Sequence, residues 1–275
     1  MKITKMQGAG NDFIMIDNFA GEIPEENFGE MAKDLCRRRL SVGADGMIIA
    51  QKPELEGDIR MVFYNADGSQ GEMCGNGARC LARFTFELGL APEKMVLETL
   101  AGLVPTERLD KELYKVRLPR PTMMEKITLP LGDLHIEAEY VELGDPGVPH
   151  LCIEKPNFDT IPQEQLLQMS RKLRHHSQLE KGANVNYYRR IEEAYYLEKT
   201  FERGVEDFTM ACGTGSGSVA VVLQKADPSL RKKRIQFSVP GGELFVEAEW
   251  SGETVLSLDL IGPATKVYEA EVLAY

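Results

Sequence analysis

The sequence has few cysteines, a single tryptophan and no long apolar run. Its five cysteines in 275 residues are too few and too scattered for a disulfide scaffold. No apolar stretch approaches the roughly 20 residues that cross a bilayer. The opening MKITKMQGAGNDF lacks the apolar core of a signal peptide. We therefore expect a cytoplasmic protein with reduced thiols.

Basic residues are also scarce, with 32 Lys and Arg against 43 Asp and Glu and a net charge of −11. A chain of this charge without a basic block is a poor partner for nucleic acid or an anionic membrane. The hydrophobic share of 43% and the charged share of 27% are typical of a globular protein. The length suits two domains of roughly 100–150 residues each. An enzyme is the function class that these features favour.

Short segments rich in β-branched and aromatic residues dominate both halves and predict strands. Four segments have helical periodicity: 26–39, 78–90, 163–173 and 216–224. The second and fourth lack a polar face, so we expect them to be buried. The prediction is an α+β fold of two pseudo-symmetric domains, each with a mixed or antiparallel sheet wrapped around a central buried helix.

The two apolar helices follow similar motifs, which indicates an internal repeat. One motif is E-M-C-G-N-G-A-R-C around Cys74, and the other is M-A-C-G-T-G-S-G-S around Cys212, half a chain length later. We expect an N-terminal domain over 1–118 and a C-terminal domain over 119–263, joined by a proline-containing linker. A last strand over about 264–275 is expected to return to the first domain.

The repeated C-G-x-G motif places a thiol and a glycine-rich turn at the start of each helix. Unpaired amides at a helix N-terminus bind anions such as carboxylates, and they should lower the pKa of the adjacent thiol. Two such thiols facing one carboxylate-bearing carbon form a two-base racemisation site. One sulfur removes the α-proton as a base, and the other delivers a proton to the opposite face.

Other readings of these motifs are weaker. A lone cysteine before a glycine turn is usually structural, but its duplication favours a function. The spacing from Cys74 to Cys80 is too wide for a zinc knuckle. The segments G-A-G-N-D-F and G-T-G-S-G-S depart from the dinucleotide and P-loop spacings, so nucleotide binding is disfavoured. Cys36 and Cys152 lie in apolar runs and are expected in the core.

Five motifs together resemble the diaminopimelate epimerase family. They are K-M-Q-G-A-G-N-D-F, N-A-D-G-S-Q-G-E-M-C-G-N-G-A-R-C, G-A-N-V-N, F-E-R-G-V and A-C-G-T-G, and they occur in the family's order over nearly the whole chain. The resemblance implies an isomerase that interconverts LL- and meso-diaminopimelate for lysine and peptidoglycan synthesis. It also implies a homodimer that works without pyridoxal phosphate, any other cofactor or a metal.

The resemblance implies roles for individual residues by matching motif. Cys74 and Cys212 would be the acid/base pair, and His150 and Glu202 would tune the thiols. The residues that would bind the amino-acid substrate are Asn11, Asn65, Gly75, Asn76, Asn184, Glu202, Arg203, Gly213 and Thr214. Taken alone, Asn11 and Asn65 would be turn residues, and Arg203 would be a surface cation. His150 alone would be a core or edge histidine.

The sequence departs from the family pattern at three positions. Val148 stands where the family often has asparagine, Gly46 where some relatives have glutamine, and Phe208 where an acidic residue is common. These changes bear on the substrate, because a site that loses a polar partner discriminates less against analogues. A racemase of another amino acid, such as histidine or a lanthionine-type analogue, therefore stays open. A non-catalytic ligand-binding relative is a third alternative.

Overall fold

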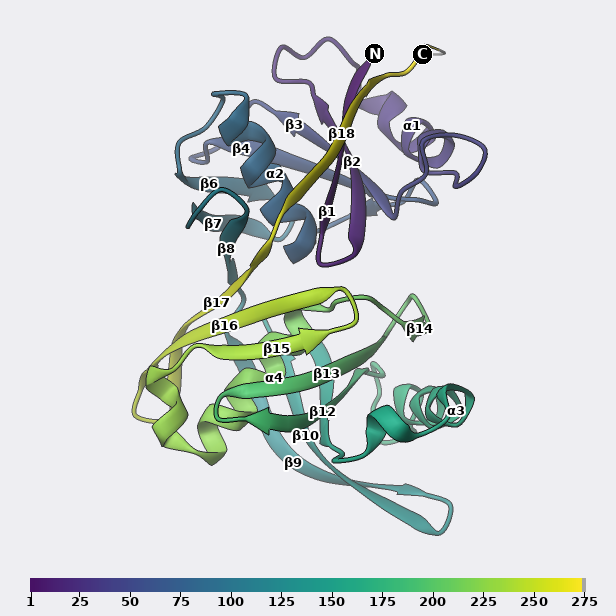
Figure 1. The fold of residues 1–275 in the computed structure, drawn as a ribbon, viewed down its shortest axis with the longest axis vertical. Helices are drawn as coiled ribbons and strands as arrows, with labels where there is room; N and C mark the ends of the chain where they lie inside the picture. The colour runs from purple at the N-terminus through teal and green to yellow at the C-terminus, as the bar shows by residue number, and fades with distance from the viewer. Residues whose placement is uncertain (274–275) are drawn as a thin grey trace. The chain divides into compact units, whose positions relative to one another are not determined.

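The computed structural model describes residues 1–273, which form two compact units (Figure 1). Unit 1 comprises residues 1–117 together with the described part of 261–275, and unit 2 comprises residues 118–260. The chain passes from unit 1 to unit 2 within β8 (Leu113–Leu118), and it returns within β17 (Thr254–Pro263). The expected limits of 1–118 and 119–263 differ from these by one to three residues. Residues 274 and 275 of the expected last strand lie outside the described residues.

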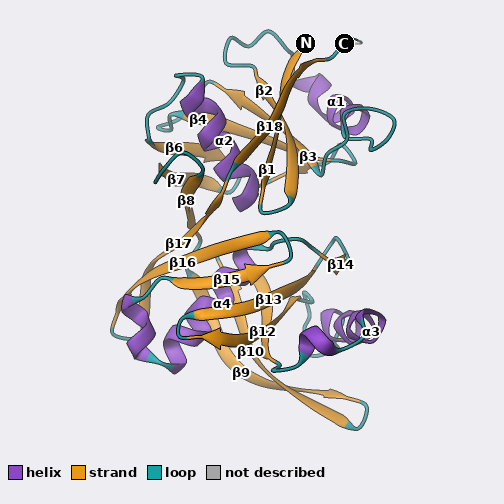
Figure 2. Ribbon diagram, in the orientation of Figure 1, coloured by secondary structure: helices purple, strands orange, loops and turns teal. Residues whose placement is uncertain are grey.

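Unit 1 is mostly strand, with two α-helices (Figure 2). Besides β8, its elements are β1 (Lys2–Gly8), β2 (Asn11–Asp17), α1 (Phe28–Leu35), β3 (Gly46–Gln51), β4 (Ile59–Asn65), β5 (Gln70–Gly71), α2 (Gly75–Glu87), β6 (Lys94–Thr99), β7 (Gly102–Arg108) and β18 (Thr265–Glu271).

The strands of unit 1 form a mixed sheet in the order β18-β1-β2-β3-β4-β6-β7-β8. The pairs β2–β3 and β4–β6 are parallel, and the others are antiparallel. The last strand, β18, lies beside the first, as Figure 1 shows. The helix α2 connects β4 to β6 and packs against β1, β2, β3, β4, β6 and β7. The sheet therefore wraps around a buried central helix.

Unit 2 repeats this composition. Its elements are β9 (Pro121–Leu131), β10 (Leu134–Leu143), β11 (Val148–Glu154), α3 (Gln163–Arg174), β12 (Asn184–Glu192), β13 (Tyr195–Glu202), β14 (Asp207–Phe208), α4 (Gly213–Ala226), β15 (Ile235–Val239), β16 (Gly242–Ser251) and most of β17. The strand order is β9-β10-β11-β12-β13-β15-β16, with β11–β12 and β13–β15 parallel.

The two units share one connectivity, which confirms the two-domain α+β fold. A parallel pair joined across α1 or α3 is followed by an antiparallel strand, β4 or β13. A second parallel crossover then contains the buried helix, α2 or α4. Even the two-residue strands match, because β5 pairs with β4 and β14 pairs with β13. Cys74 and Cys212 therefore occupy the same place in the two halves of the repeat.

The four expected helices are present, but their limits differ from the prediction. The helices α2 and α4 each begin three residues earlier than expected, so the glycines of both C-G-x-G motifs lie inside the first helical turn. Packing overrides the low helix propensity of glycine here. A side chain at Gly77 would lie 2.6 Å from Ile48 Cδ1. The helix α1 is shorter than predicted and ends at Leu35. Among the described residues, no helix combines the length and apolarity needed to span a membrane.

Candidate active site

Cys74 is the N-cap residue of α2, in extended conformation, and its side chain is half-buried. Its Sγ lies 3.7 Å from Oδ1 of Asn11, the first residue of β2. Asn11 is positioned by a two-residue hairpin turn, in which Ala9 and Gly10 both have positive φ. The hairpin turn thus brings Asn11, expected from the resemblance to bind substrate, next to the first cysteine motif within unit 1.

Asp45 fixes the orientation of the Asn11 amide. Its Oδ2 accepts a hydrogen bond of 2.7 Å from Asn11 Nδ2, and its Oδ1 accepts one of 2.8 Å from Arg38 Nη2. With Nδ2 held in this way, Asn11 Oδ1 faces the Cys74 thiol and also lies 3.4 Å from Asn76 Nδ2. Sequence reasoning missed Asp45, although its place in S-V-G-A-D-G, directly before β3, marks a polar residue at a strand end.

Arg79 is a second residue that sequence reasoning missed. It lies in the first turns of α2 with its side chain fully buried, and it donates hydrogen bonds to Asn76 Oδ1 and to the carbonyl oxygens of Gly75 and Pro263. Burial lowers the pKa of Arg79 to about 10, while its electrostatic interaction with the sulfur groups of Cys80 and Cys74 opposes the shift. Arg79 therefore carries a positive charge that favours the thiolate form of Cys74. The only signal in the sequence is a charged residue within an apolar helix.

We predict that Arg79→Met slows alkylation of Cys74 at pH 7 by about ten-fold, because one lost charge interaction is worth about one pKa unit. Arg79→Lys retains a positive charge, so its alkylation rate at Cys74 should lie between those of Arg79→Met and the wild type. Mass spectrometry of the alkylated peptides measures Cys74 and Cys212 in the same sample, so Cys212 serves as the reference. Equal alkylation rates of Cys74 in Arg79→Met and wild-type protein would contradict this role.

Asn65 and Gly46 lie at the adjoining ends of β4 and β3, where they are directly paired. Asn65 begins the predicted polar turn, which is confirmed: its N–H donates to Ser69 O, and its Nδ2 donates to Ser69 Oγ at 3.0 Å. At Gly46 a Cβ atom would lie 2.8 Å from the carbonyl oxygen of Tyr64. The backbone at this position thus leaves no room for a side chain such as glutamine.

Cys212 is the N-cap residue of α4 and is 8% exposed. Its Sγ lies 3.6 Å from Thr214 Oγ1. Burial, followed by the nearby carboxyl group of Glu202, raises the pKa of the Cys212 thiol well above its ordinary value. The expectation that the helix N-terminus lowers this pKa is wrong for Cys212, since desolvation outweighs the amide field. The side chain is therefore a neutral thiol at neutral pH.

Side chains of β11, β12 and β13 face the first turn of α4, next to Cys212. Pairing places Asn186 opposite Thr200 and Tyr188 opposite Glu198, on the same face of β12 and β13. Thr200 Oγ1 donates to Asn186 Oδ1 at 2.9 Å. A Cβ atom at Gly215 would lie 2.4 Å from that same oxygen. The glycine thus lets the first turn of α4 approach a polar part of the sheet.

His150 lies beside Asn186 and is fully buried on β11. Its Nδ1 accepts a hydrogen bond from Asn186 Nδ2 at 3.2 Å, so the ring proton is on Nε2. Burial lowers the pKa of His150 to about 3. Its Nε2 has no hydrogen-bond partner among the described residues. His150 is therefore a neutral imidazole with an N–H group available as a donor.

The remaining expected site residues of unit 2 cluster at the ends of β12 and β13. Asn184 Oδ1 accepts from the backbone N–H of Arg203 at 2.8 Å, and Nδ2 donates to Pro149 O. Arg203 lies in an exposed turn, with Nη1 bonded to Lys181 O at 3.1 Å. Glu202 Oε1 accepts from Thr209 Oγ1, and burial raises the pKa of Glu202. Asn184 thus fixes the backbone of the turn that carries Arg203.

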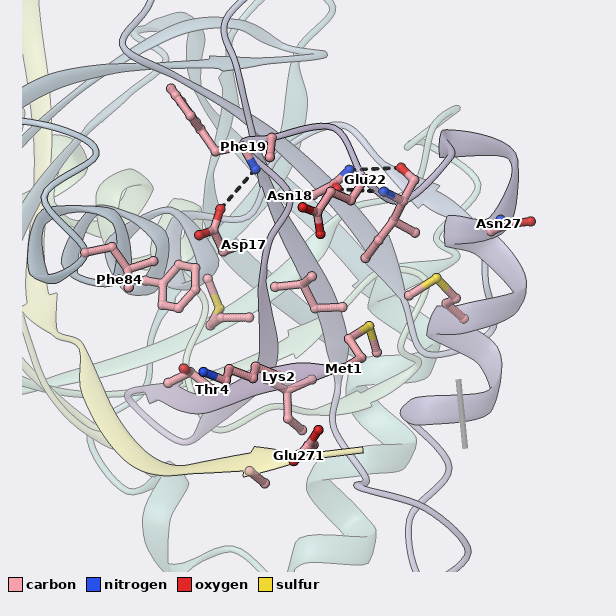
Figure 3. Close-up of a pocket in the computed structure, with 18 of the residues that line it drawn as sticks. Met1, Lys2, Thr4, Asp17, Asn18, Phe19, Glu22, Asn27, Phe84 and Glu271 are labelled. Atoms are coloured by element: carbon pink, nitrogen blue, oxygen red, sulfur yellow. Dashed lines mark hydrogen bonds between the residues drawn. The ribbon is translucent and has the colours of Figure 1, made fainter. Parts of the chain in front are cut away.

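A cavity of about 1670 Å³ lies elsewhere in unit 1, and Figure 3 shows most of the residues that line it. It extends from β1 and β2 to α1, with Phe84 near the C-terminal end of α2. Asp17 and Asn18, both labelled, form hydrogen bonds to the backbone of Phe19 and Ile23 respectively. None of the expected site residues lines this cavity, so it is separate from the cysteine motifs.

The family model described as "Diaminopimelate epimerase" matches residues 3–124 and 144–267. The chain belongs to the diaminopimelate epimerase family. With this result the predicted resemblance is confirmed, and so is its class, isomerases that act on amino acids. The family match includes both cysteine motifs and every other residue expected in the site.

Proteins similar over their full length carry the same name. The diaminopimelate epimerase of Hydrogenobaculum sp. (strain Y04AAS1) is 35% identical over 100% of this chain and 99% of its own. That of Methanothrix thermoacetophila is 37% identical over 97% of this chain and 94% of its own. That of Aquifex aeolicus is 33% identical over all of both chains.

Solved structures with little sequence identity share the fold. A phenazine biosynthesis protein of the PhzF family from Bacillus anthracis has a TM-score of 0.74 at 17% identity, covering 99% of both chains. A hydroxyproline epimerase from Agrobacterium vitis has a TM-score of 0.69 at 13% identity, covering 99% of this chain and 90% of its own. Both likenesses bear on the fold alone.

Proposed function

We propose that this protein interconverts LL- and meso-diaminopimelate by proton transfer at the α-carbon, with Cys74 and Cys212 as the two bases. Family membership supports the substrate. The observation that carries the mechanism is the equivalent position of the two cysteines, each the N-cap residue of the buried crossover helix in its unit. In the family context, the product would serve lysine and peptidoglycan synthesis.

In the proposed reaction, one sulfur acts on each face of the α-carbon. With Cys74 as the thiolate, its sulfur removes the α-proton, and the Cys212 thiol donates its proton to the opposite face. The reverse reaction begins with the opposite protonation states. Because burial raises the pKa of Cys212, its thiol is protonated at neutral pH and suits the role of acid. Arg79 supports the complementary state, a thiolate at Cys74.

The helix ends would stabilise the carbanion as it forms. The amides of Gly75 with Asn76, and of Gly213 with Thr214, lie in first turns without competing side-chain caps. We propose that these amides hold the reacting carboxylate, whose charge grows as the proton leaves. The remaining expected residues would bind the other polar groups of the substrate. In this scheme Arg203 binds the distal carboxylate, and Asn11, Asn65, Asn184 and Glu202 bind the amino groups and remaining oxygens.

Val148 is the feature that favours a second candidate, a racemase of another amino acid. It begins β11 as Asn11 begins β2, in equivalent positions of the repeat. One unit thus presents an amide where the other presents an apolar side chain. A substrate lacking one distal polar group would tolerate this difference.

The test of the proposed function is turnover by the purified wild-type protein. LL-diaminopimelate, histidine, lanthionine and proline are supplied separately, and chiral chromatography follows inversion of each. The proposal predicts rapid equilibration of LL- with meso-diaminopimelate and slow or undetectable turnover of the others. Rapid turnover of another amino acid, together with no turnover of LL-diaminopimelate, would instead support the second candidate. No turnover of any of the four would favour the non-catalytic alternative.

We also propose that the protein is a cytoplasmic homodimer. In support, β18 pairs with β1 at the end of the strand order of unit 1 and exposes Val267 and Tyr268. An edge strand with exposed apolar residues is suited to pairing with a second chain. Sedimentation equilibrium of the wild-type protein should give twice the mass of the chain, and a monomer at micromolar concentration would contradict the proposal.

A further inference from the structure

Glu198 is a buried carboxyl group for which the proposed reaction has no role. It lies on β13 with 1% of its surface exposed. No salt bridge to Glu198 occurs among the described residues, and its Oε1 has no hydrogen-bond partner there. Burying a carboxyl group without a cation is costly. A structural role alone would be served better by an apolar residue at this position.

Within the described part of the chain, the one side-chain hydrogen bond of Glu198 leads to the helix that follows Cys212. Ser216 Oγ bonds to Glu198 Oε2 and also lies 3.3 Å from the carbonyl oxygen of Cys212. The N–H of Ser216 donates to the same carbonyl oxygen, in the first turn of α4. Ser216 is thus the link between the buried carboxyl group and the backbone of the proposed catalytic cysteine.

We infer that Glu198 is a positioning residue for Cys212. Through Ser216 it fixes the first turn of α4, and ionisation of its carboxyl group places a negative charge near the Cys212 thiol. This inference rests on the proposed function. It adds a residue that does not touch the substrate and acts only through α4.

The two protonation states of Glu198 give different hydrogen bonds. The neutral carboxyl group donates to Ser216 Oγ, which leaves the serine hydroxyl to donate to Cys212 O. The carboxylate instead accepts from the serine hydroxyl, so the bond from Ser216 Oγ to Cys212 O is lost. Burial raises the pKa of Glu198 to about 8, and its hydrogen bond with Ser216 partly opposes this. The neutral state therefore prevails at pH 7, and the charged state prevails above pH 8.

The ionisable groups around Glu198 come from four elements. They are Cys212 at the start of α4, Cys152 and the neutral His150 on β11, Tyr188 opposite Glu198 on β12, and Glu202 on its own strand. The paired stretch of β15, residues 236–238, adds no ionisable group. Since none of these groups is a cation, the charge that appears on ionisation is uncompensated. It opposes formation of the Cys212 thiolate and weakens the positive end of α4 that would hold the substrate carboxylate.

The first test measures alkylation of Cys212 against pH without substrate, with Cys74 in the same sample as internal reference. Glu198→Gln keeps the shape and removes the charge. We expect its Cys212 to be alkylated about ten-fold faster than the wild type at pH 9, as one buried neighbouring charge shifts a pKa by about one unit. The alkylation rate of Cys74 should be the same in the variant and the wild type. Ser216→Ala removes the hydrogen bond that stabilises the Glu198 carboxylate. This variant should therefore also raise the alkylation rate of Cys212 at pH 9. Glu154→Gln, at an exposed carboxyl group on β11, should match the wild type.

The second test measures kcat for LL-diaminopimelate against pH. The kcat of the wild type should decline above pH 8, and the kcat of Glu198→Gln should decline at a pH about one unit higher. If the wild type is active, and Glu198→Gln has the same pH profile of kcat and the same alkylation rate of Cys212 as the wild type, the inference is overturned and the proposed function is not. If Glu198→Gln does not fold, unchanged alkylation and pH profiles in Ser216→Ala overturn it. A wild type inactive at every pH overturns the proposed function. In that case a shift of Cys212 alkylation would still support the link from Glu198 to Cys212.

Discussion

Replacing Cys74 or Cys212 with alanine is expected to lower kcat for diaminopimelate inversion by about 10²–10⁴-fold. Each substitution removes the group to which the proposed mechanism assigns proton transfer on one face, and a positioned acid or base contributes about 10²–10⁴-fold. Serine at either position should also slow inversion severely, since a hydroxyl is a far weaker acid than a thiol. The measurement is kcat in both directions, starting from LL- and from meso-diaminopimelate.

A matched control for the cysteine variants is Cys36→Ala. Cys36 is buried at 3% exposure in unit 1, follows α1 and takes no part in the proposed chemistry. This variant should retain nearly full activity despite some loss of packing. Circular dichroism must show that all the variants are folded. Activity within ten-fold of the wild type in Cys74→Ala or Cys212→Ala would refute the two-base scheme.

Glu198→Gln is expected to remove a large pH dependence of folding stability. The pKa of this carboxyl group rises from 4.5 to about 8 on folding, because the side chain is buried. A raised pKa favours the folded state fully below pH 4.5, and this contribution is lost as pH rises through 8. The wild type should therefore lose stability across this window, and the glutamine variant should not. At pH 8.5 the variant should be more stable by on the order of 4 kcal/mol, since one pKa unit is worth about 1.4 kcal/mol.

Urea unfolding at pH 5 and pH 8.5 measures this effect. At pH 5 the variant and the wild type should have similar free energies of unfolding. Glu154→Gln controls for the general loss of a carboxyl group, because that side chain is exposed. Parallel stability curves for wild type and Glu198→Gln would mean that the carboxyl group of Glu198 is not held neutral by the fold. The experiment is independent of any enzymatic activity.

The parts of this fold that could be predicted from sequence are those marked by repetition. The C-G-x-G motifs and the apolar segments that follow them indicated two buried helices, and both are crossovers between parallel strands. The helix starts were misplaced, because glycine is a poor helix former in isolation. In α2 and α4, close packing against neighbouring side chains and strands requires it.

The polar interior of unit 2 could not be predicted. In β13, alternation alone would put Leu197 inward and Glu198 outward, yet Glu198 is buried and Leu197 is only half-buried. Both faces of this strand are covered: Glu198 bonds to α4, while Leu197 packs with the cluster that includes Leu166 of α3. Periodicity separates core from solvent and cannot separate two covered faces. The pKa of Cys212 differs from the prediction for a related reason. The local sequence indicates the helix N-terminus, which lowers a thiol pKa, but it does not indicate the burial that raises the pKa of Cys212.

The most direct test of the two-base mechanism is the position of solvent deuterium in the earliest products. Wild-type protein in D₂O is given LL-diaminopimelate, and in a separate reaction meso-diaminopimelate, and both isomers are analysed by mass spectrometry below about 5% conversion. Two thiols on opposite faces predict one deuterium at the α-carbon of the product and none in the remaining substrate, in both directions. Equal labelling of product and remaining substrate in both directions would show that one base serves both faces, and it would contradict the pairing of Cys74 with Cys212.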